Sequence, residues 1–125
     1  MKIQMSTEHA IRIVRYLHLK KEGVHSAQEI SVVLGVSYPF FVKIAGMLRR
    51  AGILSAMQGR HGGYQLSKSA SEISLYDIVL AVEGELKLID RRTRDADGAC
   101  EVRSYFRQMQ KIAIANLSEQ NVAEL

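Results

Sequence analysis

The sequence predicts a mainly α-helical protein with a small two-stranded β-wing: a winged helix-turn-helix followed by a long C-terminal dimerisation helix. Three observations predict this class. Two capped helical segments, at residues 26–34 and 37–50, are joined by a turn that contains Gly35, which is the helix-turn-helix pattern. Two short apolar runs within residues 51–67 enclose a tip of glycines and cations, as in a β-hairpin. Apolar residues then recur at three-to-four spacing over residues 99–117.

The same pattern divides the chain into three parts. Residues 1–85 are expected to form the winged helix-turn-helix domain, which would bind DNA; residues 86–98 form a loop, and residues 99–125 form the dimerisation helix and tail. A chain of 125 residues fits one small domain with such an extension. The loop is assigned because residues 91–98 show no apolar periodicity.

Composition and charge narrow the class of protein. The chain start lacks a signal-peptide pattern, and no apolar run approaches the roughly 20 residues of a membrane span, so we expect a cytoplasmic protein without a membrane partner. A single cysteine excludes an internal disulfide. Residues 1–68 carry ten Lys/Arg against three Asp/Glu, whereas residues 69–125 carry seven against ten. The basic half suits a polyanion and the acidic half a protein partner; an ordinary solvated surface is the alternative.

Apolar spacing and caps predict the first two helices. Residues 6–21 place apolar side chains at i, i+3, i+4 and i+7, with Ser6 or Thr7 as the N-cap. The next helix begins with Ser26 and Glu29 at the spacing of a capping box. Its expected buried residues are Ile30, Val33 and Leu34.

Two further helices follow the same logic. Ser37 is the expected N-cap of the helix 37–50, whose apolar stripe is Phe41, Ile44, Ala45 and Leu48. Gly46 costs that helix about 1 kcal/mol relative to alanine, so either close packing or close approach to a ligand is expected there. After the hairpin, Ser74 caps a short helix, with Asp77 at the capping-box position.

The last helix carries a long apolar stripe. Its members are Val102, Tyr105, Phe106, Met109, Ile112, Ala113 and Leu117. Because the preceding domain already has a core, we expect this stripe to pair in a homodimer. Packing back on the first helix of the same chain is the alternative.

The order of helix, turn, helix and basic hairpin indicates double-stranded DNA as the partner. The helix that starts at Tyr38 would enter the major groove, where Lys43 can hydrogen-bond a guanine and Val42 can contact a thymine methyl group. A narrow minor groove would attract Arg60, and hydroxyl groups near helix starts would fix phosphates. The expected DNA contacts are Thr7, Ser26, Ser37, Tyr38, Pro39, Val42, Lys43, Gln58, Arg60 and His61.

The residue types of catalysis and metal binding are not grouped in this chain. The histidines are scattered, at His9, His18, His25 and His61, with no pair at i, i+4 and no Cys-x-x-Cys. The hairpin glycines are not followed by the Gly-Lys-Ser/Thr of a phosphate-binding loop. We therefore expect no enzyme, no catalytic residue and no metal site.

These residues resemble the Rrf-two family of bacterial winged-helix repressors, which includes an iron–sulfur-cluster regulator, a nitrite-sensitive repressor and a cysteine-metabolism repressor. The matching positions are Ser6, Thr7, Ala10, Glu29, Ile30, the runs 35–37 and 48–55, Gly59, Gly62, Gly63, Tyr64, Leu66, Ile73, Asp77, Ile78, Val79 and 81–84. The match is strong over residues 1–85 and follows by layout over 86–125. The resemblance implies a homodimeric transcription factor, here acting as a repressor, whose long C-terminal helices cross.

The chain departs from that family at two places. Many members hold an iron–sulfur cluster with three cysteines before and at the start of the long helix, whereas this chain has only Cys100, so we expect no cofactor of that type. The position just before the first hairpin glycine, an arginine in some members, is Gln58, and Arg60 is expected to take its task. Cys100 is a redox sensor, an intermolecular disulfide partner or inert.

A sensing or protein-interaction module is the second function that the sequence allows. A regulatory partner protein or a small anionic ligand would then control it, and the arginines that could accept an anion are Arg91, Arg92 and Arg94. A solvated loop is the simpler interpretation of these three residues.

Overall fold

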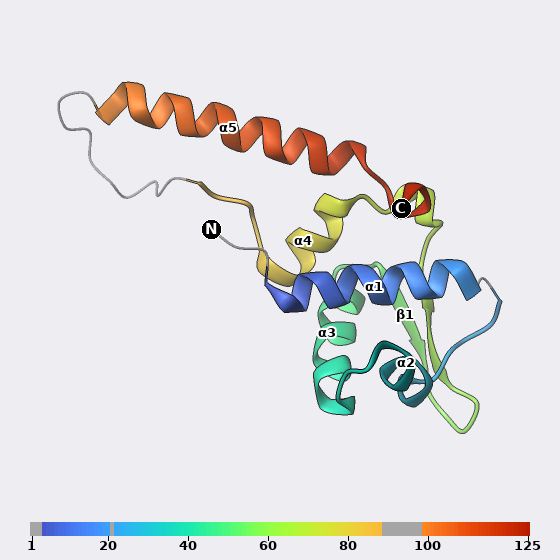
Figure 1. Cartoon of the computed structure of the whole chain (residues 1–125). Helices are drawn as coiled ribbons and strands as arrows, with labels where there is room; N and C mark the ends of the chain where they lie inside the picture. The colour runs from blue at the N-terminus through green and yellow to red at the C-terminus, as the bar shows by residue number, and fades with distance from the viewer. Residues whose placement is uncertain (1–3, 21, 89–98) are drawn as a thin grey trace.

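Seven helical segments and two strands make up the computed structural model, which describes residues 4–20, 22–88 and 99–125. In chain order they are α1 (Met5–Lys20), α2 (Ala27–Leu34), α3 (Tyr38–Arg50), β1 (Leu54–Met57), β2 (Gly63–Leu66), η1 (Ala70–Glu72), α4 (Leu75–Glu83), α5 (Ala99–Glu119) and η2 (Val122–Glu124). In Figure 1, α1 crosses the middle of the molecule, α2 and the tip of the hairpin lie below it, and α5 extends away above α4. The predicted class, mainly α with a two-stranded antiparallel sheet, is confirmed.

The core lies where α1, α3 and α4 meet, joined by residues from α2 and the hairpin. The stripe predicted for α3 is confirmed, because Phe41, Ile44, Ala45 and Leu48 are each at most 1% exposed. Burying a large apolar side chain of this kind stabilises the fold by about 1.5–3 kcal/mol. The core therefore holds α3 rigidly from one side and leaves its other side at the surface.

The start of α1 differs from the prediction. The helix begins at Met5, and the amides of Thr7 and Glu8 both donate to the Gln4 carbonyl, at 3.0 and 3.3 Å. Thr7 therefore lies inside the helix, and its side chain is 0% exposed. The prediction that Ser6 or Thr7 is the N-cap is wrong, since tertiary packing draws this turn into the domain.

The predicted start of α2 is half confirmed. Ser26 is the N-cap, and its hydroxyl accepts the Glu29 amide at 3.1 Å. The Glu29 carboxylate binds the Tyr16 hydroxyl and the His25 ring instead of the Ser26 amide, so it does not complete a capping box. The buried face also differs: Val33 is 56% exposed, whereas Ser31 is buried and donates to the Gln28 carbonyl.

The wing is an antiparallel pair in which Leu54 faces Leu66 and Met57 faces Gly63. A third backbone segment extends it, because His25 forms a bridge with Tyr64. The Tyr64 amide donates to the His25 carbonyl at 2.8 Å, and the His25 amide donates to the Tyr64 carbonyl at 2.9 Å. The residue just before the helix-turn-helix is thus bonded to the wing.

The C-terminus returns to the domain after α5. The Val122 amide donates to the Ile73 carbonyl at 2.9 Å, and Val122 is completely buried. Nearby, the predicted capping box is confirmed, because Ser74 and Asp77 exchange both hydrogen bonds, at 2.9 and 3.0 Å. These contacts anchor the end of α5 beside α4.

The rest of α5 projects from the domain (Figure 1). The helix lies against α4, and the Leu88 amide donates to the Gln110 side chain at 2.8 Å. Most of the predicted loop 86–98 lies outside the described residues, as do Arg91, Arg92 and Arg94. The apolar stripe of α5 is exposed in this single chain, so the alternative in which it packs back on α1 is not observed.

Candidate nucleic-acid interface

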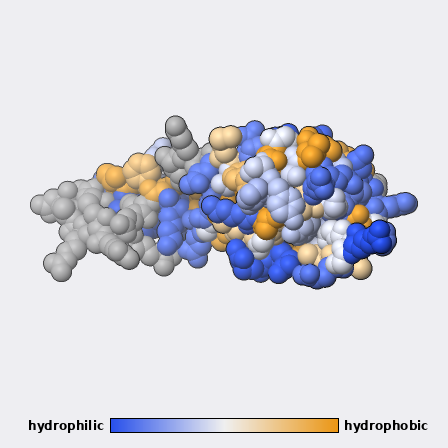
Figure 2. All heavy atoms as spheres, turned by 90° about the horizontal axis from the view of Figure 1, so that it is seen from below, coloured by the Kyte–Doolittle hydropathy of each residue, from blue (hydrophilic) through white to orange (hydrophobic). Residues whose placement is uncertain are grey.

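A hollow of about 400 Å³ opens where the first turns of α2 and α3 face the wing. Its lining is Ser26, Ala27, Gln28, Tyr38, Arg49, Ala56, Met57, Gln58, Gly59, Arg60, Gly62, Gly63 and Tyr64. Figure 2 looks from below at the side on which α2 and the hairpin tip lie, and shows a mostly hydrophilic surface with scattered hydrophobic patches. Segments more than 30 residues apart in the sequence thus form one surface.

The first turn of α3 presents the predicted reading residues. Ser37 caps the helix by accepting the Phe40 amide at 3.2 Å, with Pro39 in the first turn. Tyr38 is 56% exposed and Val42 is 38% exposed, and Lys43 is exposed beside them. They are accessible because the buried stripe of α3 occupies the opposite side of the helix.

The wing tip presents the second group of predicted contacts. Gln58, Arg60 and His61 are all exposed, and Gln58 and Arg60 line the hollow. Two glycines define the tip: Gly59 has φ +108°, and a Cβ on Gly62 would overlap the Met57 carbonyl. The tip conformation therefore requires glycine at both positions.

Arg49 also faces this hollow, and Gln28 joins it from the first turn of α2. The sequence prediction did not include either residue among the DNA contacts. Arg49 lies seven residues after Val42, which is close to two helical turns. The spacing alone therefore predicts that Arg49 lies on the same side of α3 as Val42. Nothing in the sequence placed Gln28 opposite the wing.

The hydroxyl residues divide into two groups. The Ser26 and Ser37 hydroxyls accept amides at helix starts, and an accepting hydroxyl still has its own proton to donate to a phosphate. Thr7 does not belong to the surface: its side chain is completely buried and its oxygen lacks a hydrogen-bond partner among the described residues. The prediction that Thr7 contacts phosphate is therefore incompatible with this structure.

Among the described residues, Lys43, Arg49 and Arg60 form no ion pair with a carboxylate. The ion pairs that are seen there include His25–Glu29 and Lys87–Glu85, which lie at other positions. These three positive charges can therefore meet phosphates or base edges.

The stripe predicted for dimerisation is mostly at the surface of α5. Exposed fractions are 55% for Val102, 61% for Tyr105, 41% for Phe106, 41% for Met109 and 54% for Ile112. Ala113 and Leu117 are half-buried. Side chains of this size along one helix form an exposed apolar surface, a feature that is common at sites of protein–protein interaction.

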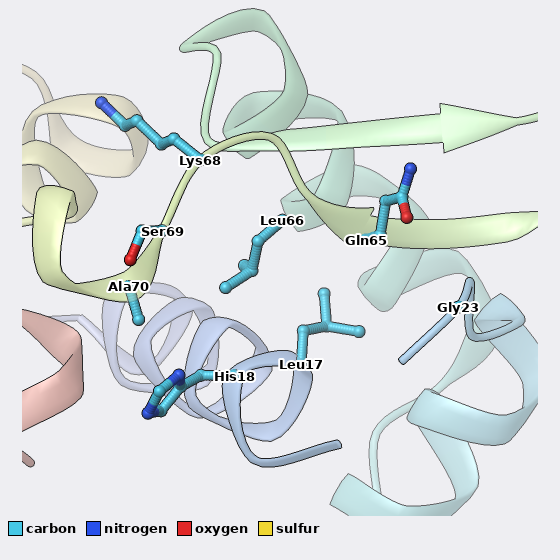
Figure 3. Close-up of a pocket in the computed structure, with 8 residues that line it drawn as sticks. All are labelled: Leu17, His18, Gly23, Gln65, Leu66, Lys68, Ser69 and Ala70. Carbon is cyan, nitrogen blue, oxygen red and sulfur yellow. The ribbon is translucent and has the colours of Figure 1, made fainter. Parts of the chain in front are cut away.

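A second hollow, of about 360 Å³, lies between the end of α1 and the segment that follows β2. Figure 3 shows Leu17 and Leu66 pointing into it, whereas the Lys68 side chain extends away from them. The arginines that the sequence analysis considered for an anionic ligand, Arg91, Arg92 and Arg94, are not part of this hollow and lie outside the described residues.

The described residues were also compared with the requirements of a metal site and of a membrane-spanning helix. No group of three His, Cys, Asp or Glu side chains is placed to hold a metal ion in the part of the chain that the structure describes, and the side chain of Cys100 lies outside that part. No single described helix is long and apolar enough to cross a membrane; α2 and α3 pass by length and composition only as a pair, bent by 111° at their junction.

An exposed second helix beside a basic hairpin is the reading unit of winged helix-turn-helix regulators. The model of the Rrf2 (Rrf-two) family, described as an iron-dependent transcriptional regulator, matches residues 3–125, and the chain belongs to this family. Protein aau3 of Rhizobium meliloti (strain 1021) is 34% identical over 90 residues, which are 72% of this chain and 58% of that protein. The chain thus matches somewhat more than half the length of this relative.

Solved structures share the fold. CymR, the global cysteine regulator of B. subtilis, superimposes with a TM-score of 0.81 at 22% identity, covering 98% of this chain and 94% of CymR. The oxidized form of Staphylococcus aureus CymR gives 0.73 at 27% identity, covering 98% and 93%. IscR of T. potens gives 0.77 at 23% identity, covering 98% and 84%. The family is one of transcriptional regulators, as the sequence predicted.

Proposed function

We propose that this chain is a sequence-specific DNA-binding repressor that acts as a homodimer in the cytoplasm. The observation that carries the proposal is one hollow shared by α2, α3 and the wing, with Arg49 and Arg60 in its lining, together with Lys43 exposed on α3. These cations have no carboxylate partner in the described part of the chain. A surface of this shape and charge fits a polyanion with grooves.

We propose the following role for each of these residues. The first turns of α3 enter the major groove, where Lys43 hydrogen-bonds a guanine and Val42 and Pro39 contact thymine methyl groups. Arg60, at the glycine-rich wing tip, enters the neighbouring minor groove, with Gln58 and His61 on the backbone. Ser26 and Ser37 donate to phosphates from the starts of α2 and α3.

Dimerisation supplies the second half-site. The exposed stripe of α5 meets the same stripe of a second copy, which buries Tyr105 and Phe106 and places two wings on one operator. In the single chain, Tyr105 and Phe106 contact each other edge to face with ring centroids 5.7 Å apart. Aromatic pairs of this kind are common at the centre of protein interfaces.

We further propose that no iron–sulfur cluster of the three-cysteine type controls this regulator. The chain has one cysteine, so a dimer has two, whereas such clusters are commonly held by four ligands. Iron in amounts comparable to protein after anaerobic purification would refute this. Control by a partner protein, or by Cys100 as a redox sensor, is the alternative. A stoichiometric co-purifying protein together with no DNA affinity would favour a protein-interaction module.

The direct test measures binding to the DNA upstream of the chain's own gene by gel shift. Lys43→Ala and Arg60→Ala should each weaken binding, and the affinity of the unaltered protein should fall steeply with salt. Lys87→Ala is the matched control, because it removes an exposed cation that pairs with Glu85 away from the hollow. If the control and the two interface variants bind alike, the proposed reading surface is wrong.

A further inference from the structure

His25 connects the wing to the start of α2, two parts of the molecule that the DNA interface needs in register. The His25 carbonyl accepts the Tyr64 amide of β2 at 2.8 Å, and the His25 amide donates to the Tyr64 carbonyl at 2.9 Å. The next residue, Ser26, is the N-cap of α2 and lines the hollow together with Gly63 and Tyr64. A Cβ on Gly63 would overlap the His25 carbonyl, so the sequence leaves room for this close backbone approach. A shift of His25 would therefore change the distance between the wing and α2.

The His25 ring lies between two hydrogen-bond acceptors. Its Nδ1 is 2.7 Å from the Glu29 carboxylate, and its Nε2 is 3.1 Å from the Glu22 carbonyl. A carbonyl and an ionised carboxylate only accept, whereas a neutral imidazole has a single N–H to donate. Only the doubly protonated ring satisfies both contacts. The geometry is thus that of an imidazolium.

The groups around the ring support this charge state. The same Glu29 oxygen accepts the Tyr16 hydroxyl at 2.7 Å, and the Tyr16 ring meets the His25 ring edge to face at 6.0 Å. The Tyr16 hydrogen bond, followed by the His25 contact, lowers the pKa of Glu29 below its ordinary value, although partial burial opposes this. Lys20 lies over the Tyr16 ring at 5.7 Å and adds a second positive charge near Glu29. A carboxylate that stays ionised keeps its attraction for the imidazolium.

We propose that His25 is a positioning residue for DNA binding: its protonated ring, held by Glu29 and the Glu22 carbonyl, keeps the wing in register with the start of α2. This inference rests on the proposed function. A side chain that cannot make both contacts loosens the wing, and the protein then binds DNA more weakly.

The first experiment needs no DNA. Amide hydrogen exchange of Tyr64 is compared at pH 6 between the unaltered protein and His25→Gln. Glutamine cannot donate in both directions, so Tyr64 should exchange about threefold to tenfold faster, as expected for losing a charge-assisted hydrogen bond in a partly exposed site. His18→Gln is the matched control and should leave Tyr64 unchanged, because His18 lines the other hollow. Should His25→Gln fail to fold, Glu29→Ala removes the acceptor of the Nδ1 contact instead.

The second experiment measures the DNA dissociation constant at pH 6. The constant should rise by about threefold or more in His25→Gln, while His18→Gln should leave it unchanged. Unchanged Tyr64 exchange, or an unchanged dissociation constant in His25→Gln, overturns the inference and leaves salt-dependent DNA binding intact. If the unaltered protein binds no DNA but His25→Gln still speeds the amide exchange of Tyr64, the proposed function fails while the structural role of His25 stands.

Discussion

Gly63 and Gly46 form a pair of glycines whose replacement by alanine should have opposite effects. At Gly63, the first residue of β2, a Cβ would overlap the His25 carbonyl and lie 2.9 Å from the Ser26 amide nitrogen. Both neighbours are backbone, so they cannot move aside without displacing the N-cap of α2 from the wing. At Gly46, inside α3, the nearest atom is the Arg50 guanidinium at 3.5 Å, an ordinary contact with a flexible side chain.

The magnitudes follow from these surroundings. Gly63→Ala should destabilise the fold by about 1–3 kcal/mol, the range for forcing extra atoms into a packed site. Gly46→Ala should stabilise it by about 0.5–1 kcal/mol, because alanine has the higher helix propensity. For a domain of this size, 1 kcal/mol corresponds to a Tm change of about 4 °C. The two variants should therefore differ in Tm by several degrees, in opposite directions from the unaltered protein.

The assay is thermal and urea unfolding followed by circular dichroism, with DNA affinity measured on the same samples. Gly63→Ala should also weaken DNA binding, since the displaced wing carries Arg60. Gly63→Ala with unaltered Tm and affinity would refute the close approach of β2 and His25. If Gly46→Ala unfolds at a higher temperature yet binds DNA more weakly, Gly46 is needed for close approach to a ligand and not for packing.

Three other perturbations test separate parts of the structure. Phe106→Glu places a charge in the exposed stripe of α5 and should convert dimers to monomers in light scattering; persistent dimers would rule out that stripe as the interface. Glu29→Gln should lower the free energy of unfolding near neutral pH. The folded state lowers the pKa of Glu29, so the ionised carboxylate stabilises the fold above its unfolded pKa of about 4.3. This stabilisation is lost as the pH falls through the folded pKa, so the difference between the two proteins should vanish in acid. A difference that persists in strong acid would contradict this. Ser74→Ala removes the N-cap of α4 and should cost about 1 kcal/mol in urea unfolding, whereas Ser67→Ala, at an exposed position outside any helix, should cost little.

Local signals explain what could be predicted of the fold. The caps at Ser26, Ser37 and Ser74 and the stripe of α3 depend on neighbours within four residues, so spacing along the chain identifies them. The hairpin was equally visible, because its tip requires glycine. Of the candidate site, the exposed residues of α3 and the wing tip were predicted as contacts, and their role in DNA binding stays a prediction.

Contacts between distant segments account for the rest. Glu29 has the spacing of a capping box, yet it pairs with Tyr16 and His25, because α1 lies beside it only in the folded chain. Val33 stays exposed since none of the described elements covers that side of α2, and Thr7 is buried since the domain packs around the start of α1.

The sequence alone determined the helix-turn-helix, the glycine-rich wing, the amphipathic last helix and the resemblance to one regulator family, because short-range spacing encodes them. The tertiary structure decided that His25 pairs with the wing as a third backbone segment and that Arg49 lines the same hollow as Arg60. It also decided that Val122, which follows α5 in the sequence, is buried in the core of the domain. Each of these depends on which distant segments become neighbours, and that is settled by burying one shared core.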